Sequence, residues 1–445
     1  AIIQLIESSS ERGLMNKFGG IFLHRTDKMS PEDLALVYSV AHAQFRRKLP
    51  PKEDLIQKGV ETKSWLNSDA IEDDKPASVK YERDRDTDQV EQNLHFYNGF
   101  GGFSKEGNEY RIHIKIDPES NRHVFPPAPW VNVLSNPDFG SLISESGAGY
   151  TWSENSRENK ITSWSNDPIS DPHSEAFYIR DNENKIFWSP APGPVPGNGN
   201  YEVAHGFGYT TFYHTSGGLK QELTHFVPLH DSGKISRLVI ENLENSIRSL
   251  SLFRYLDRVL GVSRNSSSRY IVSSFANEKD ALIFQNFYNN EFAGRVAYSG
   301  VYKSENEQEV FYTTERENFI GRNRSLNNPL SICKSQNLDN QINIGSDPCA
   351  AIQLNLKLKI GAKRVVYFID GEAKSEEEAK EILSKYRDNE RAESALHAIK
   401  NFWSEKIGKV QVETPDKSID LLVNGWLTYQ NLSSRMWGRS AYCQG

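Results

Sequence analysis

Apolar and polar residues alternate along two stretches of the chain in a way that predicts β-strands. Residues 110–116 place Tyr or Ile at every even position with Arg, His or Lys between them, and residues 352–360 repeat the pattern with Ile and Leu. Alternation with a period of two is typical of a half-buried strand. Shorter strand-like runs lie at 269–275, 281–287 and 310–314, and turn clusters lie at 192–194 and 197–199. Because no helical pattern separates these runs, we predict a mainly β fold with some α, built on a large antiparallel β-sandwich.

Helical patterns flank the predicted sandwich. Ser30, followed by Pro31 and two acids, predicts a helix start, because Ser caps the first turn and acids favour its positive end. The Ser-Glu-Glu-Glu run at 375–378 is a capping box, and another helix is expected to start near 414–416. The predicted units are an N-terminal helical segment (1–71), a charged linker (72–89), the β-sandwich (90–372), a helical linker (373–412) and a last helical stretch (413–445). A solvated surface strand is the alternative for residues 72–89.

Composition excludes several classes of protein. The 445 residues carry a formal net charge of -7, which argues against a broad nucleic-acid surface. The three cysteines, at 333, 349 and 443, form no CxxC pair, so we expect a reducing compartment and a cytoplasmic location. No apolar run approaches the roughly 20 residues of a membrane span. The first residue is Ala and no signal peptide precedes the first helix, so we expect a processed or excised piece.

No self-contained catalytic motif appears in the sequence. HExxH, GxSxG, P-loop and zinc-finger spacings are absent, and we predict no metal site. The densest histidine cluster has spacings of no known metal site, so we interpret its members as hydrogen-bonded residues on strands and turns: His205, His214, His225 and His230. The glycine-rich run at 98–110 lacks the strand-to-helix setting of a phosphate loop, and we interpret it as a tight turn packed against the sheet.

The segment Glu145–Pro168 has neither helical nor strand periodicity, so we predict a loop. It is rich in Trp, Asn, Ser, acidic residues and one Arg. Arg157 offers a planar fork for hydroxyl or anionic groups, and Trp152 and Trp164 offer flat apolar faces. Such a composition favours a sugar-binding surface. The alternative is an ordered surface loop that satisfies its own polar groups, and its many acids do not single out a general acid.

The run PPAPWVNVLSNPDFGSLISESGAGYTWSENSRENKITSWSNDPISDP, residues 126–172, resembles the N-terminal sandwich of the cellobiose-phosphorylase family of inverting glycoside phosphorylases. It is most similar to the branch that holds β-1,2-oligoglucan phosphorylases and the C-terminal region of cyclic β-1,2-glucan synthases. Further stretches in collinear order carry the same resemblance: 14–41, 93–110, 187–196, 205–212, 319–329 and 345–353.

The resemblance implies a supersandwich-like β domain, a helical linker, an (α/α)6 barrel and a small C-terminal β domain. The last stretch, 421–445, resembles the first barrel helix and ends before the family's sugar-binding motif. In this family inorganic phosphate is a co-substrate that attacks the anomeric carbon, while a barrel Asp protonates the leaving oxygen. The resemblance therefore implies no catalytic residue in residues 1–445 and no cofactor, and we expect the chain alone to be inactive.

A sandwich loop in this family reaches over a barrel pocket, often that of the partner subunit in a homodimer. By position, the resemblance implies that the matching residues contact a β-glucan oligosaccharide: Tyr150, Trp152, Asn155, Ser156, Arg157, Glu158, Asn159, Thr162, Trp164, Asn166 and Asp167.

Three hypotheses remain open at this point. The chain is part of a glycosyltransferase-type glycoside phosphorylase or of a cyclic β-1,2-glucan synthase. Alternatively, it is a stand-alone carbohydrate-binding or dimerisation module. Under the third hypothesis, the chain is a scaffold only. A second polypeptide then carries the barrel and is the partner of this chain.

Overall fold

The computed structural model describes residues 22–24, 28–40, 94–276, 281–289, 291–302, 309–334, 336–342, 344 and 347–439. The chain divides into two compact units, residues 1–73 and 74–445. In the first unit, helix α2 covers Pro31–Val40, and the Asp33 amide donates to the Ser30 hydroxyl at 3.0 Å, which confirms the predicted cap. The predicted charged linker 72–89 lies outside the described residues, as does most of segment 1–71.

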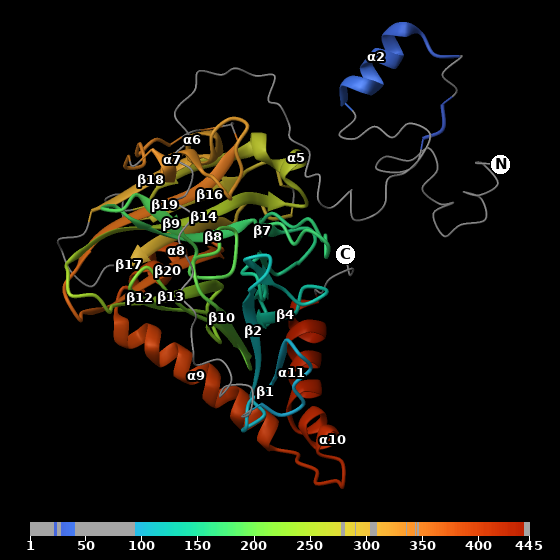
Figure 1. The fold of residues 1–445 in the computed structure, drawn as a ribbon, viewed down its shortest axis with the longest axis vertical. Coiled ribbons are helices and arrows are strands. Elements are labelled where there is room, and N and C mark those ends of the chain that lie inside the picture. Colours follow the sequence, from blue (N-terminus) through green and yellow to red (C-terminus); the bar gives the residue numbers. More distant parts are fainter. Residues whose placement is uncertain are drawn as a thin grey trace. The chain divides into compact units, whose positions relative to one another are not determined.

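Two antiparallel sheets dominate the second unit (Figure 1). Within the described residues, the larger sheet has eleven strands in the order β1-β2-β10-β11-β12-β13-β20-β17-β16-β15, with β3 beside β2. Its strands are β1 (Gly101–Phe103), β2 (Glu109–Asp117), β3 (Arg122–Val124), β10 (Tyr201–Gly206), β11 (Tyr209–Ser216), β12 (Leu219–Phe226), β13 (Gly233–Asn242), β15 (Ile271–Phe275), β16 (Ala281–Asn286), β17 (Val296–Tyr302) and β20 (Lys363–Ala373).

The smaller sheet has nine strands in the described residues, in the order β18-β19-β14-β7-β6-β5-β4, with β8 paired to β14 and β9 to β8. Its strands are β4 (Val131–Ser135), β5 (Phe139–Ser144), β6 (Gly149–Ser153), β7 (Lys160–Thr162), β8 (Glu175–Asp181), β9 (Ile186–Trp188), β14 (Arg248–Gly261), β18 (Val310–Glu315) and β19 (Pro348–Leu358).

The main core lies between the sheets and follows the alternation read from the sequence. Ile112 and Ile114 of β2 are fully buried, and so are Leu354 and Leu358 of β19. Each such side chain contributes roughly 1.5–3 kcal/mol by leaving water. The predicted strands at 110–116 and 352–360 and the mainly β antiparallel fold class are thus confirmed.

Helices cover the outer face of the larger sheet. Buried Trp403 and Ile399 of the longest helix belong to the same apolar cluster as Tyr209, Tyr298 and other sheet residues. Smaller helices connect or cover strand ends. The helices of the second unit are α5 (Arg264–Ser267), η3 (Ser268–Tyr270), α6 (Arg316–Ile320), α7 (Leu330–Cys333), α8 (Glu376–Lys385), α9 (Asn389–Gly408), α10 (Lys417–Leu421), α11 (Leu427–Gln430) and the π-helical turns η5 (Leu422–Trp426) and η6 (Asn431–Gly438).

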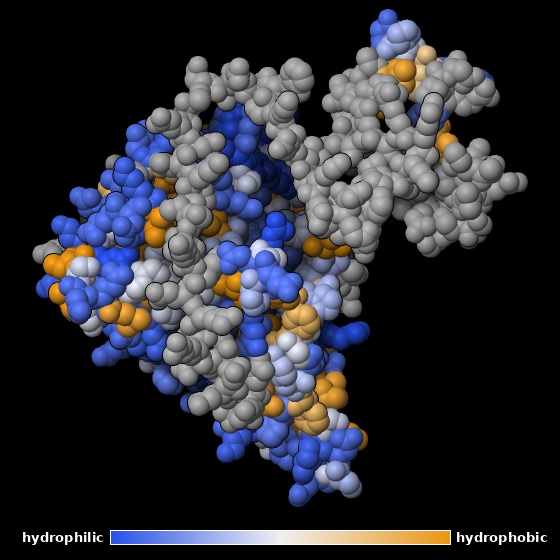
Figure 2. All heavy atoms as spheres, viewed as in Figure 1, coloured by the Kyte–Doolittle hydropathy of each residue, from blue (hydrophilic) through white to orange (hydrophobic). Residues whose placement is uncertain are grey.

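The predicted helix starts of this region are confirmed. Ser375 caps α8 by accepting a hydrogen bond from the Glu378 amide at 3.2 Å, and Asp416 caps α10 through the Ser418 amide at 2.9 Å. From α10 to η6 the chain forms one continuous helical run, which ends at Arg439 with φ +49°. Hydrophobic side chains show on the surface of this helical end in Figure 2. Ile419, Leu422 and Leu427 of this run are exposed. The domain boundaries proposed from the sequence stay predictions.

Candidate functional site

The segment Glu145–Pro168 is not the continuous loop that its sequence predicts. Residues Gly149–Ser153 form β6 and Lys160–Thr162 form β7, and β6 pairs with β5 over the register Ile143↔Gly149 to Phe139↔Ser153. All five residues of β6 are buried, so no alternation of apolar and polar residues marks it. Residues 154–159 join β6 to β7, and we call them the β6–β7 turn. Residues 163–168, which follow β7, belong to no strand or helix, as predicted.

The aromatic residues of this segment pack inside the protein. Tyr150 and Trp152 are 2% exposed, and the Tyr150 ring lies 4.6 Å from the ring of the half-buried Trp164. A Cβ atom at Gly140 would overlap the Trp152 indole, and Gly438 at the end of η6 also lies against that indole. The aromatic residues therefore join the smaller sheet to the last helical turn instead of forming a flat outer surface.

Thr162 and Asn159 are also buried. Thr162 donates a hydrogen bond to Oε1 of Glu175 at 2.9 Å, and Thr151 donates to the same oxygen at 2.6 Å. Glu175 therefore ties β6 to β7. Burial alone would raise the pKa of Glu175, but the neighbouring charges of Lys234 and Arg254 hold it well below its usual range. A buried carboxylate in this setting is charged and structural, because its oxygens are occupied by protein donors.

Arg295 fastens the β6–β7 turn to the larger sheet. Its guanidinium donates to Oε1 of Glu154 at 2.9 Å, to Oγ of Ser153 at 3.1 Å and to Oε2 of Glu372 at 2.8 Å. The side-chain amide of Asn159 donates to the same Glu372 oxygen at 2.6 Å. Burial raises the pKa of Glu372, and Arg295 opposes that rise. We call Arg295, Glu372, Glu154 and Asn159 the arginine clamp.

The exposed residues of the β6–β7 turn are held from below by hydrogen bonds. Oδ1 of Asn155 accepts from the amides of Arg157 and Glu158 at 3.0 and 2.9 Å, which shapes the turn. The Arg157 side chain is 69% exposed and forms a 3.3 Å ion pair with Glu158. Ser156 donates to the carbonyl of Arg439 at 3.1 Å. The turn thus presents a guanidinium and carboxylates beside the end of η6.

Asn166 and Asp167 lie on the following turn, and both are partly exposed. The Asp167 carboxylate accepts from the Ile169 amide at 2.9 Å, and its bond from the Ser170 hydroxyl lowers the pKa of Asp167. Of the proposed contacts, the structure brings together Asn155, Ser156, Arg157 and Glu158 at the surface. It sets Tyr150, Trp152, Asn159 and Thr162 beneath them. The substrate-contact role of the whole set stays a prediction.

Sequence reasoning did not single out Glu145. Its carboxylate is 3% exposed, accepts the Trp130 amide at 2.7 Å and borders a cavity of about 660 Å³ walled by prolines of 126–129 and 192–196. Burial raises the pKa of Glu145 to about 8, while the Trp130 amide opposes the rise. In the sequence, Glu145 stands between a strand and a Gly-containing turn, and this position is the signal that could have pointed to it. The many acidic residues nearby hid that signal.

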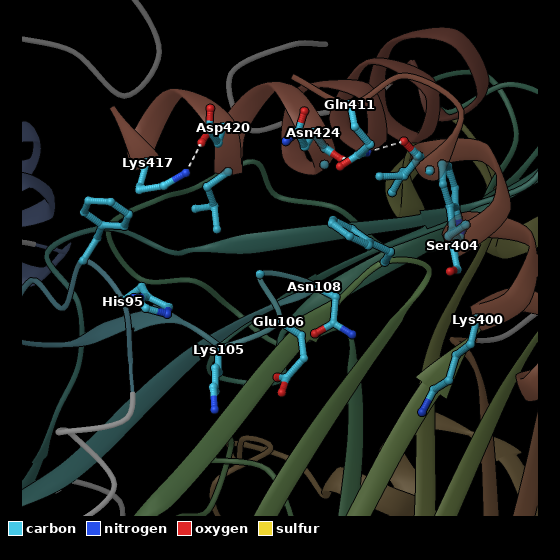
Figure 3. A pocket seen from close by; sticks show the side chains of 18 of the residues that line it. His95, Lys105, Glu106, Asn108, Lys400, Ser404, Gln411, Lys417, Asp420 and Asn424 are labelled. Carbon is cyan, nitrogen blue, oxygen red and sulfur yellow. Dashed lines mark hydrogen bonds and ion pairs between the residues drawn. The ribbon is translucent and has the colours of Figure 1, made fainter. Parts of the chain in front are cut away.

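A second cavity, of about 640 Å³, lies where the β1–β2 hairpin meets α9 and α10. In Figure 3, Lys105, Glu106 and Asn108 lie across it from Asp420 and Asn424 of the helical run. Lys417 forms a 3.0 Å ion pair with Asp420 at its edge. The glycine-rich run 98–110 belongs to this hairpin, since Gly101–Phe103 pairs with β2.

Hydrogen bonds on strands and turns were predicted for four histidines and are confirmed for three of them, His205, His214 and His225, while the prediction for His230 stays a prediction. His205 contacts the Thr210 hydroxyl at 3.0 Å and the Trp130 carbonyl at 2.9 Å, His214 contacts the Asn200 carbonyl, and His225 contacts the Ser236 hydroxyl. The described parts of the chain hold no group of three or more His, Cys, Asp or Glu residues arranged for a metal ion. Nor does any helix among the described residues have the length and apolar character to cross a membrane.

A two-sheet sandwich is followed by a capped linker helix and a further helical run. The chain belongs to the glycosyl hydrolase 94 family: the family's supersandwich domain matches residues 109–389, and its catalytic domain matches residues 402–445. The resemblance read from the sequence is thereby confirmed. The first match covers most of the two sheets, and the second covers the helical run from α10 to η6.

Curated relatives cover the chain to different extents. Cyclic beta-(1,2)-glucan synthase NdvB of Rhizobium meliloti (strain 1021) is 30% identical over 429 residues, which are 95% of this chain and 15% of the relative. N,N'-diacetylchitobiose phosphorylase of Vibrio furnissii is 28% identical over 350 residues, 77% of this chain and 42% of the relative. 3-O-beta-D-glucopyranosyl-beta-D-glucuronide phosphorylase of Paenibacillus borealis is 24% identical over 346 residues, with the same two coverages of 77% and 42%. The chain thus spans less than half the length of each.

Proposed function

We propose that this chain forms the substrate-orienting part of a glycosyl hydrolase 94 enzyme that acts on β-1,2-linked glucan oligosaccharides. The β6–β7 turn contacts the glucan through its exposed side chains, Asn155, Ser156, Arg157 and Glu158. The observation that carries the proposal is the hydrogen bond from Ser156 to the Arg439 carbonyl, because it joins the turn to the stretch that matches the catalytic domain. An exposed guanidinium beside that stretch suits a ligand rich in hydroxyl groups.

Exposed residues and buried residues have different roles in this proposal. Arg157 donates hydrogen bonds to sugar hydroxyls, and Glu158 accepts them. Arg295 and Glu175 hold the turn in one conformation, so less entropy is lost when the sugar binds. Inorganic phosphate is the co-substrate and glucose 1-phosphate the product of the complete enzyme, and the chain supplies orientation and no acid or nucleophile. We also propose that the complete enzyme is a cytoplasmic homodimer without a cofactor.

The β-1,2 linkage is supported by the relative that matches 95% of the chain, which is a cyclic beta-(1,2)-glucan synthase. The phosphorylase relatives match 77% of the chain. This difference in coverage favours a second candidate, in which the chain is the matching region of a cyclic β-1,2-glucan synthase. In that case the β6–β7 turn binds a growing or trimmed β-1,2-glucan by the same contacts.

Isothermal titration of the chain with sophorose and longer β-1,2-glucan oligosaccharides tests the proposal. We expect binding that Arg157→Ala weakens about tenfold, the effect of losing one charge-assisted hydrogen bond. Arg391→Ala is the matched control, since Arg391 is 63% exposed and makes only a long ion pair of 3.9 Å with Asp388. Equal binding by the wild type and Arg157→Ala contradicts the proposal. Release of glucose 1-phosphate by the chain alone contradicts the view that it holds no catalytic group.

A further inference from the structure

Two tyrosines stack on the surface at one end of the larger sheet. Tyr270, at the end of η3, and Tyr288, just after β16, have ring centroids 4.2 Å apart and planes inclined by 14°. They are 43% and 69% exposed, and their chain neighbourhoods add exposed Phe287 and Val262. We call Tyr270 and Tyr288 the tyrosine platform. Singly exposed apolar residues need no explanation, but a parallel pair of exposed rings is a ready contact surface.

Hydrogen bonds fix the platform in place. The Asn286 side chain donates to the Leu260 carbonyl at 2.9 Å and accepts the Tyr288 amide at 3.1 Å. The end of β16 is therefore tied to the end of β14, just before the segment that carries Tyr270. Because both rings are supported by strand ends, little conformational freedom is lost when a ligand packs against them.

The end of β14 also holds the β6–β7 turn. Lys160 at the start of β7 pairs with Gly261 of β14 and donates through Nζ to the Val262 carbonyl at 3.0 Å. The chain after Tyr288 leads through the Phe292 turn to Arg295, which binds Glu154 and Ser153. The end of β14 therefore supports both the platform, through Leu260, and the β6–β7 turn, through Gly261 and Val262.

We infer that the tyrosine platform is a secondary binding site for glucose rings of a glucan chain that extends past the β6–β7 turn. The apolar face of a glucose ring packs on an aromatic plane while its hydroxyls stay in water. Because the two rings stack and cover one face of each other, the sugar packs on the outer face of the stack, where Tyr288 is the more exposed ring. Exposed Arg269 and partly exposed Asn289 flank the rings with polar groups. For its ligand class the inference rests on the proposed function.

Titration of the full chain with a long linear β-1,2-glucan and with sophorose tests the platform. We expect Tyr288→Ala to weaken binding of the long glucan about tenfold and to leave sophorose binding unchanged, because the disaccharide occupies only the turn. Tyr288→Phe keeps the ring and should bind as the wild type does. Ile360→Ala is the control, since Ile360 is 57% exposed on the β19–β20 connection. Thermal unfolding should be the same for all variants.

Three results would contradict the proposal that the tyrosine platform binds a glucan chain. These are unchanged binding of the long glucan by Tyr288→Ala, no glucan binding by the wild type, or a change in sedimentation that marks the tyrosines as a protein interface. Arg157→Ala separates the two proposals, because it should weaken both probes. If Arg157→Ala has no effect but Tyr288→Ala still weakens the long glucan, the role of the turn fails and the platform stands. The reverse pattern removes the platform and keeps the turn.

Discussion

Replacing Arg295 by Ala removes the centre of the arginine clamp. The Arg295 side chain is 12% exposed, and its partner Glu372 is 3% exposed, so the variant leaves a buried carboxylate without its compensating charge. Removal of one partner from a buried pair costs about 3–5 kcal/mol. We expect the lower end of that range, because Asn159 still donates to Glu372 at 2.6 Å and Glu154 is 40% exposed to water.

The loss should depend on pH. Burial already raises the pKa of Glu372, and removing the positive charge of Arg295 raises it further. A group whose pKa is higher in the folded protein stabilises the fold below its unfolded pKa and loses that contribution as the pH rises through the folded value. Arg295→Ala should therefore be more destabilised at pH 8 than at pH 5. The double variant with Glu372→Gln should recover part of the loss.

Urea unfolding at both pH values measures the free energy of unfolding, and limited proteolysis reports on the β6–β7 turn. Arg157→Ala, which removes an exposed ion pair of 3.3 Å, is the control and should change stability by less than about 0.5 kcal/mol. If the effects of Arg295→Ala and Glu372→Gln simply add and neither varies with pH, the clamp does not couple these residues and the reasoning fails.

Three other changes have expected results. Burial raises the pKa of Glu145 from an ordinary 4.5 to about 8, so its contribution to stability is complete below pH 4.5 and is lost as the pH rises through 8. Glu145→Gln should therefore reduce the change of the free energy of unfolding with pH, measured by urea unfolding. An unchanged pH dependence would refute the assignment. Burial lowers the pKa of His205 to about 4 from 6.5, so stability is lost as the pH falls from 6.5 towards 4, and His205→Gln should reduce this loss in acid titrations followed by circular dichroism. Gly140→Ala should cost about 1–3 kcal/mol by overlap with Trp152, measured by thermal unfolding. Gly294→Ala, where no atom lies within 4 Å of the new methyl group, should be neutral, and equal melting temperatures for both alanine variants would contradict the overlap.

Strands with one face towards the core could be predicted because their burial leaves a pattern in the sequence. Ile112 and Ile114 are fully buried, while the flanking Arg111, His113 and Lys115 are only partly buried, so alternation survives. Helix starts were predictable for a similar local reason. At the start of α8, the Ser375 hydroxyl accepts a hydrogen bond from the Glu378 amide, and the two residues are only three positions apart in the sequence. Residues 149–153 gave no such signal, because the sheet interior covers one face of β6 and residues around Trp152 and η6 cover the other.

The sequence by itself determined the sandwich, the capped helices and the family, because strand alternation, capping and collinear motifs are local properties of the chain. The tertiary structure alone decided which residues of Glu145–Pro168 face water. Arg157 is exposed and Trp152 is buried, although both looked equally suited to a sugar surface. Glu175, Glu372 and Arg295 come from distant parts of the chain, and their charges act on the turn only after the two sheets bring them together. Electrostatic contacts of this kind depend on distance and burial, which no local pattern of residues encodes.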